Sequence, residues 1–552
     1  MKYYVADFET VTKAPTRVWA WGVIEIGRER MTYDNNIESF FEWVKGKYKI
    51  EQNKIIYFHN LSWDAEFIFQ YLLSNGFRYD PDKNSETFNC LITSTGEFYA
   101  IEVIFKRYTK NFHKVTFYDS LKKLPFSVEK IGRDFGFGIE KGSIDYDLDR
   151  PLDHVITEEE KDYLYKDLKI VADALNVQFQ QDLKKMTIGS DALNNFKERI
   201  GKKEFKYTYP VFSIEVDDDI RQAYRGGFTY LNPKYKGVDV GAGLVYDINS
   251  SYPAVMRYEK LPYGDAIYYD GKYVPDDIYD LYCQKIICEF TLKPGHLPTI
   301  QMKNSGRFTD TEYITASGVE PLGIWLTNVD LKLFFDHYDV HTIHKWVGGW
   351  MFKSTVGVFD EYIDYWMHVK STSTGAIREL AKLMLNSLYG KFASKLRVEG
   401  RYPELVDGVI KYFSTGEKER KAIYTPLSTF ITSYARNNMI RTAQNNYDRF
   451  LYADTDSLHL IGTETPVLDI HPTKLGAWKF EYEFEKARYL KAKLYQNMVT
   501  GSHKIKGAGM TDKLKLTIGW DEFKIGFTGK KKQRKSVKGG VILQDTDFTI
   551  NE

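Results

Sequence analysis

The chain has 552 residues, which is too long for one hydrophobic core and predicts three or four domains. Its hydrophobic content of 43% and mean hydropathy of −0.43 are those of a globular protein, and no run of about 18 apolar residues predicts a membrane span. A net charge of +1 does not point to nucleic acid, although 41 Tyr and 35 Phe offer faces for stacking bases. Three cysteines (Cys90, Cys283, Cys288) form no disulfide framework or zinc motif, and they fit a reducing, cytoplasmic setting.

The first third of the chain predicts a mixed sheet flanked by helices. Runs rich in β-branched and aromatic residues predict strands over residues 2–8, 19–26, 54–58 and 114–119. A helical pattern covers residues 63–73. Thr157 and Glu160 form a capping box that opens a further helix through about residue 177.

The rest of the chain mixes strands and helices. The pattern predicts a strand over 241–246, an amphipathic helix over 373–391, a hairpin over 451–460 and a strand over 540–543 after a basic run at 530–535. Residues 260–356 are rich in strand and turn signals and carry no obvious chemistry.

A first group of acidic residues begins at Asp7 and Glu9. Residues two apart on a strand face the same side, so these two carboxylates lie next to each other. Such a pair is electrostatically costly unless a cation lies between its members. The alternative is an edge strand with solvated acids.

Asp64 and Asp167 extend this group. Asp64 follows an apolar strand at a helix start, where it could be a simple N-cap. Tyr163 and Asp167 lie one turn apart on one face of a helix, where a polar pair is often just surface. Together with Asp7 and Glu9, however, they could converge on two divalent ions, which stabilise the attacking and leaving oxygens of a phosphodiester. Tyr163 would then orient the attacking water.

A second group consists of Asp247, Asp454 and Asp456. Asp247 ends a strand, and Tyr252 follows it at a turn enforced by Pro253. Asp454 and Asp456 lie in the expected hairpin, where two acids separated by one residue are usually exposed turn residues. Four flanking apolar residues indicate instead that the hairpin is buried: Leu451, Tyr452, Leu458 and Leu460. A buried pair of carboxylates implies a metal ion.

The helix over 373–391 has two faces. Its apolar stripe is formed by Ile377, Leu380, Met384 and Leu388. Its opposite side carries Arg378, Lys382, Asn386 and Tyr389. This could be a solvated basic face, but it also suits a triphosphate held by Lys382 and a base pair packed against Tyr389.

These residues and their order resemble a known family. The acids around Asp7 resemble the tyrosine-bearing branch of the DEDD exonucleases, which have a ribonuclease H-like fold. The whole series resembles the family B DNA polymerases, and within them the protein-primed branch. The motifs that carry the resemblance span the chain: 7–10, 60–64, 118–121, 163–167, 224–228, 247–253, 382–390, 432–436, 452–457, 493–495, 507–511 and 539–541.

The resemblance implies roles for the polymerase residues. Asp247 and Asp456 would bind the metals, with Asp454 beside them. Tyr252 would exclude a 2′-hydroxyl. Arg378 and Lys382 would hold the triphosphate, and Asn386 and Tyr389 would line the base-pair pocket. Three further residues would contact the primer and template: Tyr224, Lys493 and Tyr495.

It also implies roles for the exonuclease residues. Asp7, Glu9, Asp64 and Asp167 would bind metal, and Tyr163 would act with them. The unpaired primer end would be held by Asn60, Trp63, Ser120, Leu121, Lys141 and Tyr146. Two positions depart from the expected pattern: Ala453 stands between Tyr452 and Asp454, and Trp63 fills a position where Phe is expected.

The implied fold is α+β and multidomain, with a ribonuclease H-like exonuclease domain joined to a right-hand polymerase domain. The expected divisions are the exonuclease (1–187), palm (188–259 and 422–525), an insertion that docks a terminal protein (260–356), fingers (357–395), a second insertion for processivity and strand displacement (396–421), and a small thumb (526–552).

The resemblance implies a virus-encoded, monomeric replicative DNA polymerase in the cytoplasm of a bacterial host. Its partners would be template and primer DNA, dNTPs and a terminal protein, with no membrane. Two Mg²⁺ ions per site would be the cofactors, with Mn²⁺ as a substitute. The alternatives are an exonuclease with a vestigial polymerase domain and a non-catalytic single-strand DNA-binding factor.

Overall fold

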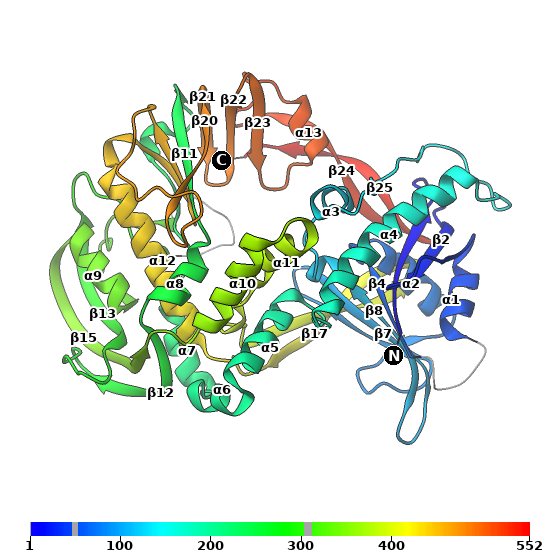
Figure 1. Ribbon diagram of the computed structural model, residues 1–552, viewed down its shortest axis with the longest axis horizontal. Helices are drawn as coiled ribbons and strands as arrows, with labels where there is room; N and C mark the ends of the chain where they lie inside the picture. Colours follow the sequence, from blue (N-terminus) through cyan, green and yellow to red (C-terminus); the bar gives the residue numbers. More distant parts are fainter. Residues whose placement is uncertain (1, 47–52, 303–311, 552) are drawn as a thin grey trace.

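The computed structural model describes residues 2–46, 53–302 and 312–551 (Figure 1). At one end lies an eight-stranded sheet in the order β3-β2-β1-β4-β8-β7-β6-β5. Its strands are β1 (Lys2–Thr10), β2 (Val18–Glu25), β3 (Met31–Asp34), β4 (Lys54–Phe58), β5 (Arg78–Tyr79), β6 (Thr87–Ile92), β7 (Phe98–Arg107) and β8 (Phe112–Asp119). Strands β1, β4 and β8 run parallel and β1 pairs antiparallel with β2, so the expected mixed sheet is confirmed.

Helices cover this sheet, as the sequence predicts. They are α1 (Ile37–Lys45), α2 (Asp64–Ser74), α3 (Val128–Phe135) and α4 (Glu158–Gln180). The capping box of Thr157 and Glu160 is present, and α4 continues three residues beyond the expected end at 177. Leu164, Leu168 and Leu175 of α4 are buried against the sheet.

The centre of the molecule is a five-stranded sheet in the order β20-β11-β19-β18-β9. Its strands are β9 (Thr229–Leu231), β11 (Gly243–Ile248), β18 (Phe450–Asp454), β19 (Ser457–Ile461) and β20 (Trp478–Phe484). The expected hairpin over 451–460 is therefore confirmed as β18 and β19. Beside this sheet lies a four-stranded sheet of β10 (Asp239–Val240), β21 (Lys486–Lys491), β22 (Leu494–Val499) and β23 (Ser502–Gly507).

The remaining helices surround this centre. They are α5 (Ile188–Ile200), α6 (Lys202–Thr208), α7 (Ile214–Gln222), α8 (Ser251–Tyr258), α10 (Asp360–Thr372), α11 (Gly375–Ser387), α12 (Thr425–Asn445) and α13 (Asp512–Thr517). The expected helix over 373–391 is shorter, because α11 ends at Ser387 and a 3₁₀ turn covers Tyr389–Lys391. The Ser428 hydroxyl of α12 donates to the Tyr389 carbonyl (2.6 Å), which anchors this turn. None of the described helices is long and apolar enough to cross a membrane.

The described residues of the segment 260–356 form a folded unit rather than a loop. It is a sheet of β12 (Leu261–Asp270), β15 (Tyr338–Thr355), β13 (Leu281–Leu292) and β14 (Leu322–Thr327), covered by α9 (Asn328–His337). Ile286, Phe290 and Phe334 lie in its own buried core. This unit occupies the end of the molecule opposite the eight-stranded sheet (Figure 1).

Two long hairpins return to the eight-stranded sheet. The first, β16 (Arg397–Val406) with β17 (Val409–Glu419), buries Ile410 in the core beside that sheet. The second, β24 (Thr528–Val537) with β25 (Gly540–Thr549), buries Val541 in the same core. Figure 1 shows β24 and β25, in red, extending to the N-terminal elements in blue.

A buried ion pair fastens the end of the first sheet to the following helices. Lys123 comes just after β8 and contacts Asp191 of α5, with side-chain exposures of 0% and 1%. The ammonium also donates to the carbonyls of Leu183 (3.0 Å) and Lys185 (3.1 Å). All donors of Lys123 are thus used inside the protein.

We expect Lys123→Met to lower the free energy of unfolding by about 3–5 kcal/mol, because it leaves the Asp191 carboxylate buried without its partner. Urea unfolding followed by circular dichroism measures this change. Lys130→Met removes a partly exposed pair with Asp134 and should change stability by no more than about 0.5 kcal/mol. Equal effects of the two substitutions would contradict the assignment of the buried pair as a fastening contact.

Two candidate carboxylate active sites

The first site is a cavity of about 900 Å³ beside the eight-stranded sheet. Asp7 and Glu9 project into it from β1, which lies between β2 and β4 and is not an edge strand. The Glu9 side chain is 5% exposed, so the alternative of an edge strand with solvated acids is wrong. Burial, and to a smaller extent the charge of Asp167, raises the pKa of Asp7 to about 7. Burial and the charge of Asp7 raise the pKa of Glu9 well above its usual value.

Asp64 is the first residue of α2 and is not its N-cap, which is Trp63. Its carboxylate accepts a hydrogen bond from the Phe8 backbone N–H (3.3 Å), which ties it to the strand that carries Asp7 and Glu9. Burial and the nearby Asp7 charge raise the pKa of Asp64. The structure therefore brings Asp64 beside Asp7, as the sequence predicts.

Tyr163 and Asp167 face the same cavity from α4 and are 4% and 6% exposed, so they are not surface residues. The hydroxyls of Tyr163 and Tyr146 are 2.6 Å apart. Lys141 donates to Asp167, and its ammonium lies 5.5 Å from the centre of the Tyr163 ring. Burial raises the pKa of Tyr163, which keeps the phenol neutral and able to donate a hydrogen bond.

Of the other predicted residues of this site, Trp63 lines the cavity, whereas Asn60, Ser120 and Leu121 do not. Asn60 has a left-handed backbone (φ 72°), and the Trp63 indole N–H donates to the Thr10 hydroxyl (3.3 Å). Ser120 is buried and contacts the His59 ring (2.9 Å) rather than the cavity, and Leu121 follows it at the start of a 3₁₀ turn.

The residues of this cavity fit divalent cations. Their donors are all carboxylate oxygens, the type that Mg²⁺ prefers, and Asp167 Oδ1 is buried with no hydrogen-bond partner. Lys141 forms an ion pair with Asp167 and brings a positive charge to these acids. Across the described residues, no three His, Cys, Asp or Glu side chains are close enough to form a ready-made metal site.

The second site lies on the five-stranded sheet. Asp247 of β11 pairs across the strands with Ser457 of β19, and the Ile248 N–H donates to the Asp456 carbonyl (2.8 Å). Burial, followed by the Asp456 and Glu481 charges, raises the pKa of Asp247 to about 7. Asp454 accepts from the Thr229 hydroxyl (3.1 Å) and lies 3.4 Å from the Lys493 ammonium. The strands of the hairpin are buried, as its flanking residues predict, whereas Asp454 and Asp456 at its tip are half-buried.

A cationic face lies opposite these acids. Arg378 and Asn386 of α11 are exposed, while Leu380, Met384 and Leu388 are buried, so the two predicted faces of this helix are confirmed. Lys382 contacts Glu379 (2.5 Å). The rings of Tyr252 and Tyr389 are 4.1 Å apart, which places α8 next to the end of α11.

Two residues of this site were missed by the sequence analysis. Lys370 of α10 donates to the Ser250 hydroxyl (2.9 Å), and burial with the charges of Lys382 and Arg378 lowers its pKa. Glu481 of β20 accepts a hydrogen bond from Lys479 (2.7 Å), and its charge helps to raise the pKa of Asp247. Neither residue belongs to a motif with fixed spacing, but alternation in β20 places Glu481 and Lys479 on one face.

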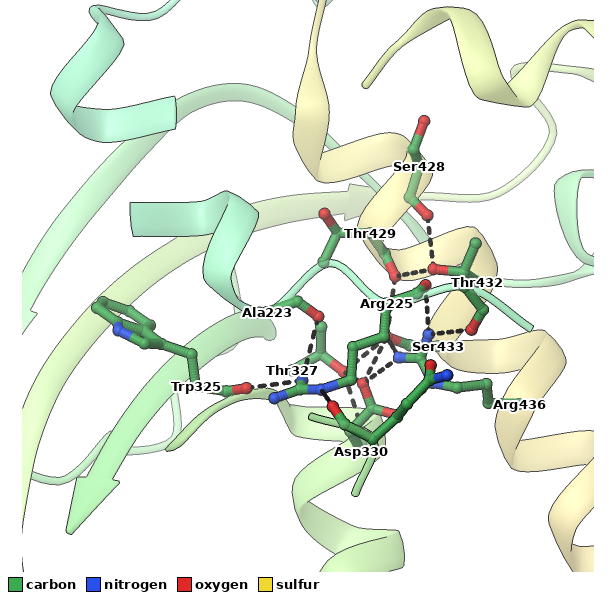
Figure 2. Close-up of polar contacts among 12 residues, drawn as sticks. Ala223, Arg225, Trp325, Thr327, Asp330, Ser428, Thr429, Thr432, Ser433 and Arg436 are labelled. Atoms are coloured by element: carbon green, nitrogen blue, oxygen red, sulfur yellow. Dashed lines mark hydrogen bonds and ion pairs between the residues drawn. The ribbon is translucent and has the colours of Figure 1, made fainter. Parts of the chain in front are cut away.

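A buried polar network holds the segment Tyr224–Phe228 against the second site. Figure 2 shows Arg436 of α12 between Asp330 and the Arg225 segment. Arg436 donates to the carbonyls of Arg225 (2.7 Å) and Gly226 (3.0 Å), and it pairs with Asp330 (2.5 Å). A methyl group at Gly227 would lie 2.7 Å from the Thr455 side chain, so this segment needs glycine where it meets the acidic hairpin.

Lys493 and Tyr495 lie on the other side of the hairpin. The Lys493 N–H donates to the Tyr452 hydroxyl (3.0 Å), and Tyr495 stacks on Tyr489 with ring centres 4.7 Å apart. Burial raises the pKa of Tyr452 and Tyr495, which therefore stay neutral. Asp247, Lys493 and Tyr495 thus lie beside the acidic hairpin, and Tyr252 and Tyr389 lie close enough to Asp456 to be affected by its charge.

The fold agrees with the comparisons to known proteins. The family described as DNA polymerase type B, organellar and viral, matches residues 47–183 and 148–475. The chain belongs to this family and is a DNA-directed DNA polymerase with the expected multidomain α+β architecture.

Its relatives include phage polymerases of similar length. The chain is 44% identical to the DNA polymerase of Bacillus phage phi29, covering 100% of this chain and 99% of that protein. It is 35% identical to the DNA polymerase of Streptococcus phage Cp-1, again over 100% and 99%. The solved phi29 DNA polymerase complexed with primer-template DNA and incoming nucleotide substrates matches with a TM-score of 0.94, at 43% identity and 100% coverage of both chains.

Proposed function

We propose that this polymerase also carries a 3′→5′ proofreading exonuclease, that it starts synthesis from a terminal protein, and that it copies processively while displacing the opposite strand. One observation supports the nuclease: Asp7, Glu9 and Asp167 line a cavity beside the eight-stranded sheet, with the buried Asp64 next to Asp7, whereas Asp247 and Asp456 belong to the five-stranded sheet and its hairpin. A polymerase with one activity has no need for this second group, because buried unpaired acids are costly.

In the polymerase site, Asp247 and Asp456 would hold two Mg²⁺ ions, or Mn²⁺, with Asp454 beside them. When bound in either site, such ions lower the pKa of the attacking oxygen and neutralise phosphate charge. Arg378 and Lys382 supply positive charge for the triphosphate. Asn386, Tyr389 and the neighbouring Tyr252 would line the space for the new base pair and its sugar.

In the nuclease site, Asp7, Glu9, Asp64 and Asp167 would hold the second pair of ions. Tyr163, kept neutral by burial, would orient the attacking water through its hydroxyl. The residues proposed to hold the unpaired primer end are Asn60, Trp63, Ser120, Leu121, Lys141 and Tyr146. Tyr224, Lys493 and Tyr495 would hold the primer and template near the polymerase site.

The partners follow from the relatives. Because a similar polymerase is complexed with primer-template DNA and nucleotides, we assign template, primer and dNTPs to this chain. The relatives come from phages, which supports a virus-encoded protein acting in a bacterial host, and we further propose that it acts as a monomer. The folded unit at 260–356 is the proposed docking site for the terminal protein, and the palm, fingers and thumb keep the divisions given above.

Primer extension and degradation of a 3′-labelled single strand, both with Mg²⁺, test the two activities together. Extension with degradation is the expected result. Degradation without extension would favour a vestigial polymerase, and binding without either would favour a single-strand binding factor. Adding a candidate terminal protein to a linear template without an oligonucleotide primer tests protein priming, which should give products attached to that protein.

We expect Tyr252→Val to let ribonucleotides in. Shortening the side chain next to Tyr389 opens space beside the 2′-carbon of an incoming sugar, and the preference for dNTPs should fall by about 100-fold or more, about the discrimination that a steric contact with one hydroxyl supplies. The ratio of kcat/KM for dNTP and rNTP measures this. Tyr252→Phe, which keeps the ring, is the matched control. Unchanged discrimination in Tyr252→Val would mean that another residue forms the gate.

We expect trimming of residues 397–420 to a short turn to leave gap filling intact but to destroy processive strand displacement. The β16–β17 hairpin contacts the thumb hairpin: a methyl group at its turn residue Gly408 would lie 3.5 Å from Lys538 Cγ. The two hairpins would thus close a ring around DNA and slow its dissociation. The measurement is extension through duplex DNA with a competitor trap.

The trim also removes Ile410 from the core beside the eight-stranded sheet. Retained degradation of single-stranded DNA is therefore the control that this core survives. A trimmed enzyme that still copies through long duplex in one encounter would show that the hairpin does not close a ring.

A further inference from the structure

The C-terminal hairpin contributes side chains to the nuclease cavity. Lys532, Arg534 and Leu543 of this hairpin line the same cavity as Asp7 and Glu9, together with Lys513 of α13. Arg534 and Leu543 are cross-strand partners in β24 and β25, so they lie on one face of the hairpin. Arg534 nevertheless remains exposed to solvent, so a nucleic-acid strand can approach it.

Arg534 contacts the loop that carries the proposed primer-holding residues. Its guanidinium donates to the Ser62 hydroxyl, a contact across 472 residues of sequence, and lies 5.6 Å from the centre of the Trp63 ring. The Trp63 indole is therefore held by Arg534 on its ring and by the Thr10 hydroxyl at its N–H. The position of this indole depends on the thumb.

The Ser62 hydroxyl links Arg534 to Asn60 through two hydrogen bonds. Because its oxygen accepts from Arg534, the Ser62 hydroxyl hydrogen is directed to Asn60 Oδ1, 2.9 Å away. This bond fixes the side-chain amide of Asn60. One arginine thus orients both Asn60 and Trp63.

The hairpin is docked firmly enough to position a side chain. Glu66 of α2 is 7% exposed and accepts from Ser536 of β24 (3.2 Å) and from Tyr412 of β17 (2.7 Å). At the hairpin turn, a methyl group on Gly540 would lie 2.4 Å from the Phe67 ring. The turn therefore packs against α2 more closely than any other residue allows.

We propose that Arg534 is a positioning residue of the nuclease site, supplied by the thumb hairpin, which fixes Asn60 and Trp63 for the unpaired primer end. This inference rests on the proposed nuclease function. Arg534 contacts Ser62 and Trp63, and Asp64 lies close enough for the two charges to interact, so we assign Arg534 a role in binding and positioning rather than in the chemical step.

The test is the steady-state degradation of a single-stranded oligonucleotide by the full chain. We expect Arg534→Ala to raise KM about 10-fold with kcat within about twofold, since loss of a charged hydrogen bond and a cation–π contact weakens binding only. Arg534→Lys should recover part of this loss, because an ammonium keeps the charge but not the planar contact. Lys535→Ala removes one charge from the opposite face of the same strand and should leave KM unchanged.

A second measurement does not depend on turnover. A primer with 2-aminopurine at a mismatched 3′ end, mixed with the enzyme in EDTA, should show a smaller fluorescence change with Arg534→Ala than with the wild type. Ser536→Ala, which loosens the hairpin, should shift KM in the same direction by a smaller factor.

An unchanged KM in Arg534→Ala, a fall in kcat alone, or an equal effect of Lys535→Ala would overturn the inference. If the wild-type chain does not degrade single strands at all, the proposed nuclease function fails instead. Thermal midpoints equal to the wild type exclude a general loss of folding as the cause of any change.

Discussion

We expect the Asp247→Ala protein to lose template-directed nucleotide addition by about 1,000-fold or more, while it still degrades single-stranded DNA at close to the wild-type rate. Burial and the charges of Asp456 and Glu481 raise the pKa of Asp247 to about 7, which shows that its carboxylate lies among other acids. Asp454→Ala should behave in the same way, since Asp454 ends the paired strand β18.

Single-nucleotide incorporation on a primed template and degradation of a labelled single strand, measured on the same preparation, give the two rates. Asp469→Ala is the matched control, because Asp469 forms only an exposed pair with Lys474. It should keep both activities. Parallel loss of both activities in a folded Asp247→Ala protein would contradict the assignment of two separate sites.

The double substitution of Asp7→Ala and Glu9→Ala should give the reverse result. Single-strand degradation should fall by about 1,000-fold or more, because two of the four acids that would hold metal are gone, while extension of a matched primer continues. The thermal midpoint should stay the same or rise, since the substitutions remove two buried acids whose charged forms are disfavoured by burial and by each other.

Glu25→Ala is the control for this pair, because Glu25 is on the neighbouring strand β2 and forms only a surface contact with Lys2. It should leave degradation unchanged. Persistent 3′→5′ degradation by the purified double variant would mean that these acids were assigned to the wrong role. A lower thermal midpoint would show instead that the acids serve the fold.

The elements that carry the acids could be predicted because local pattern determines them. Alternation over β1 predicts that Asp7 and Glu9 share a face, and the capping box at Thr157 predicts the start of the helix that carries Tyr163 and Asp167. The two faces of α11 follow from helical periodicity in the same way, although the end of the helix does not, because Ser428 of α12 anchors the turn after it.

The sequence by itself therefore determined the two groups of acids and the strands and helices that present them, since these depend on the spacing of nearby residues. Only the tertiary structure decided which distant residues join them. Lys370 and Glu481 enter the polymerase site, and Arg534 reaches Ser62 and Trp63, through the docking of elements far apart in the chain. Such contacts depend on how whole elements pack, as the turn at Gly540 packs against Phe67. The periodicity of nearby residues in the sequence does not predict them.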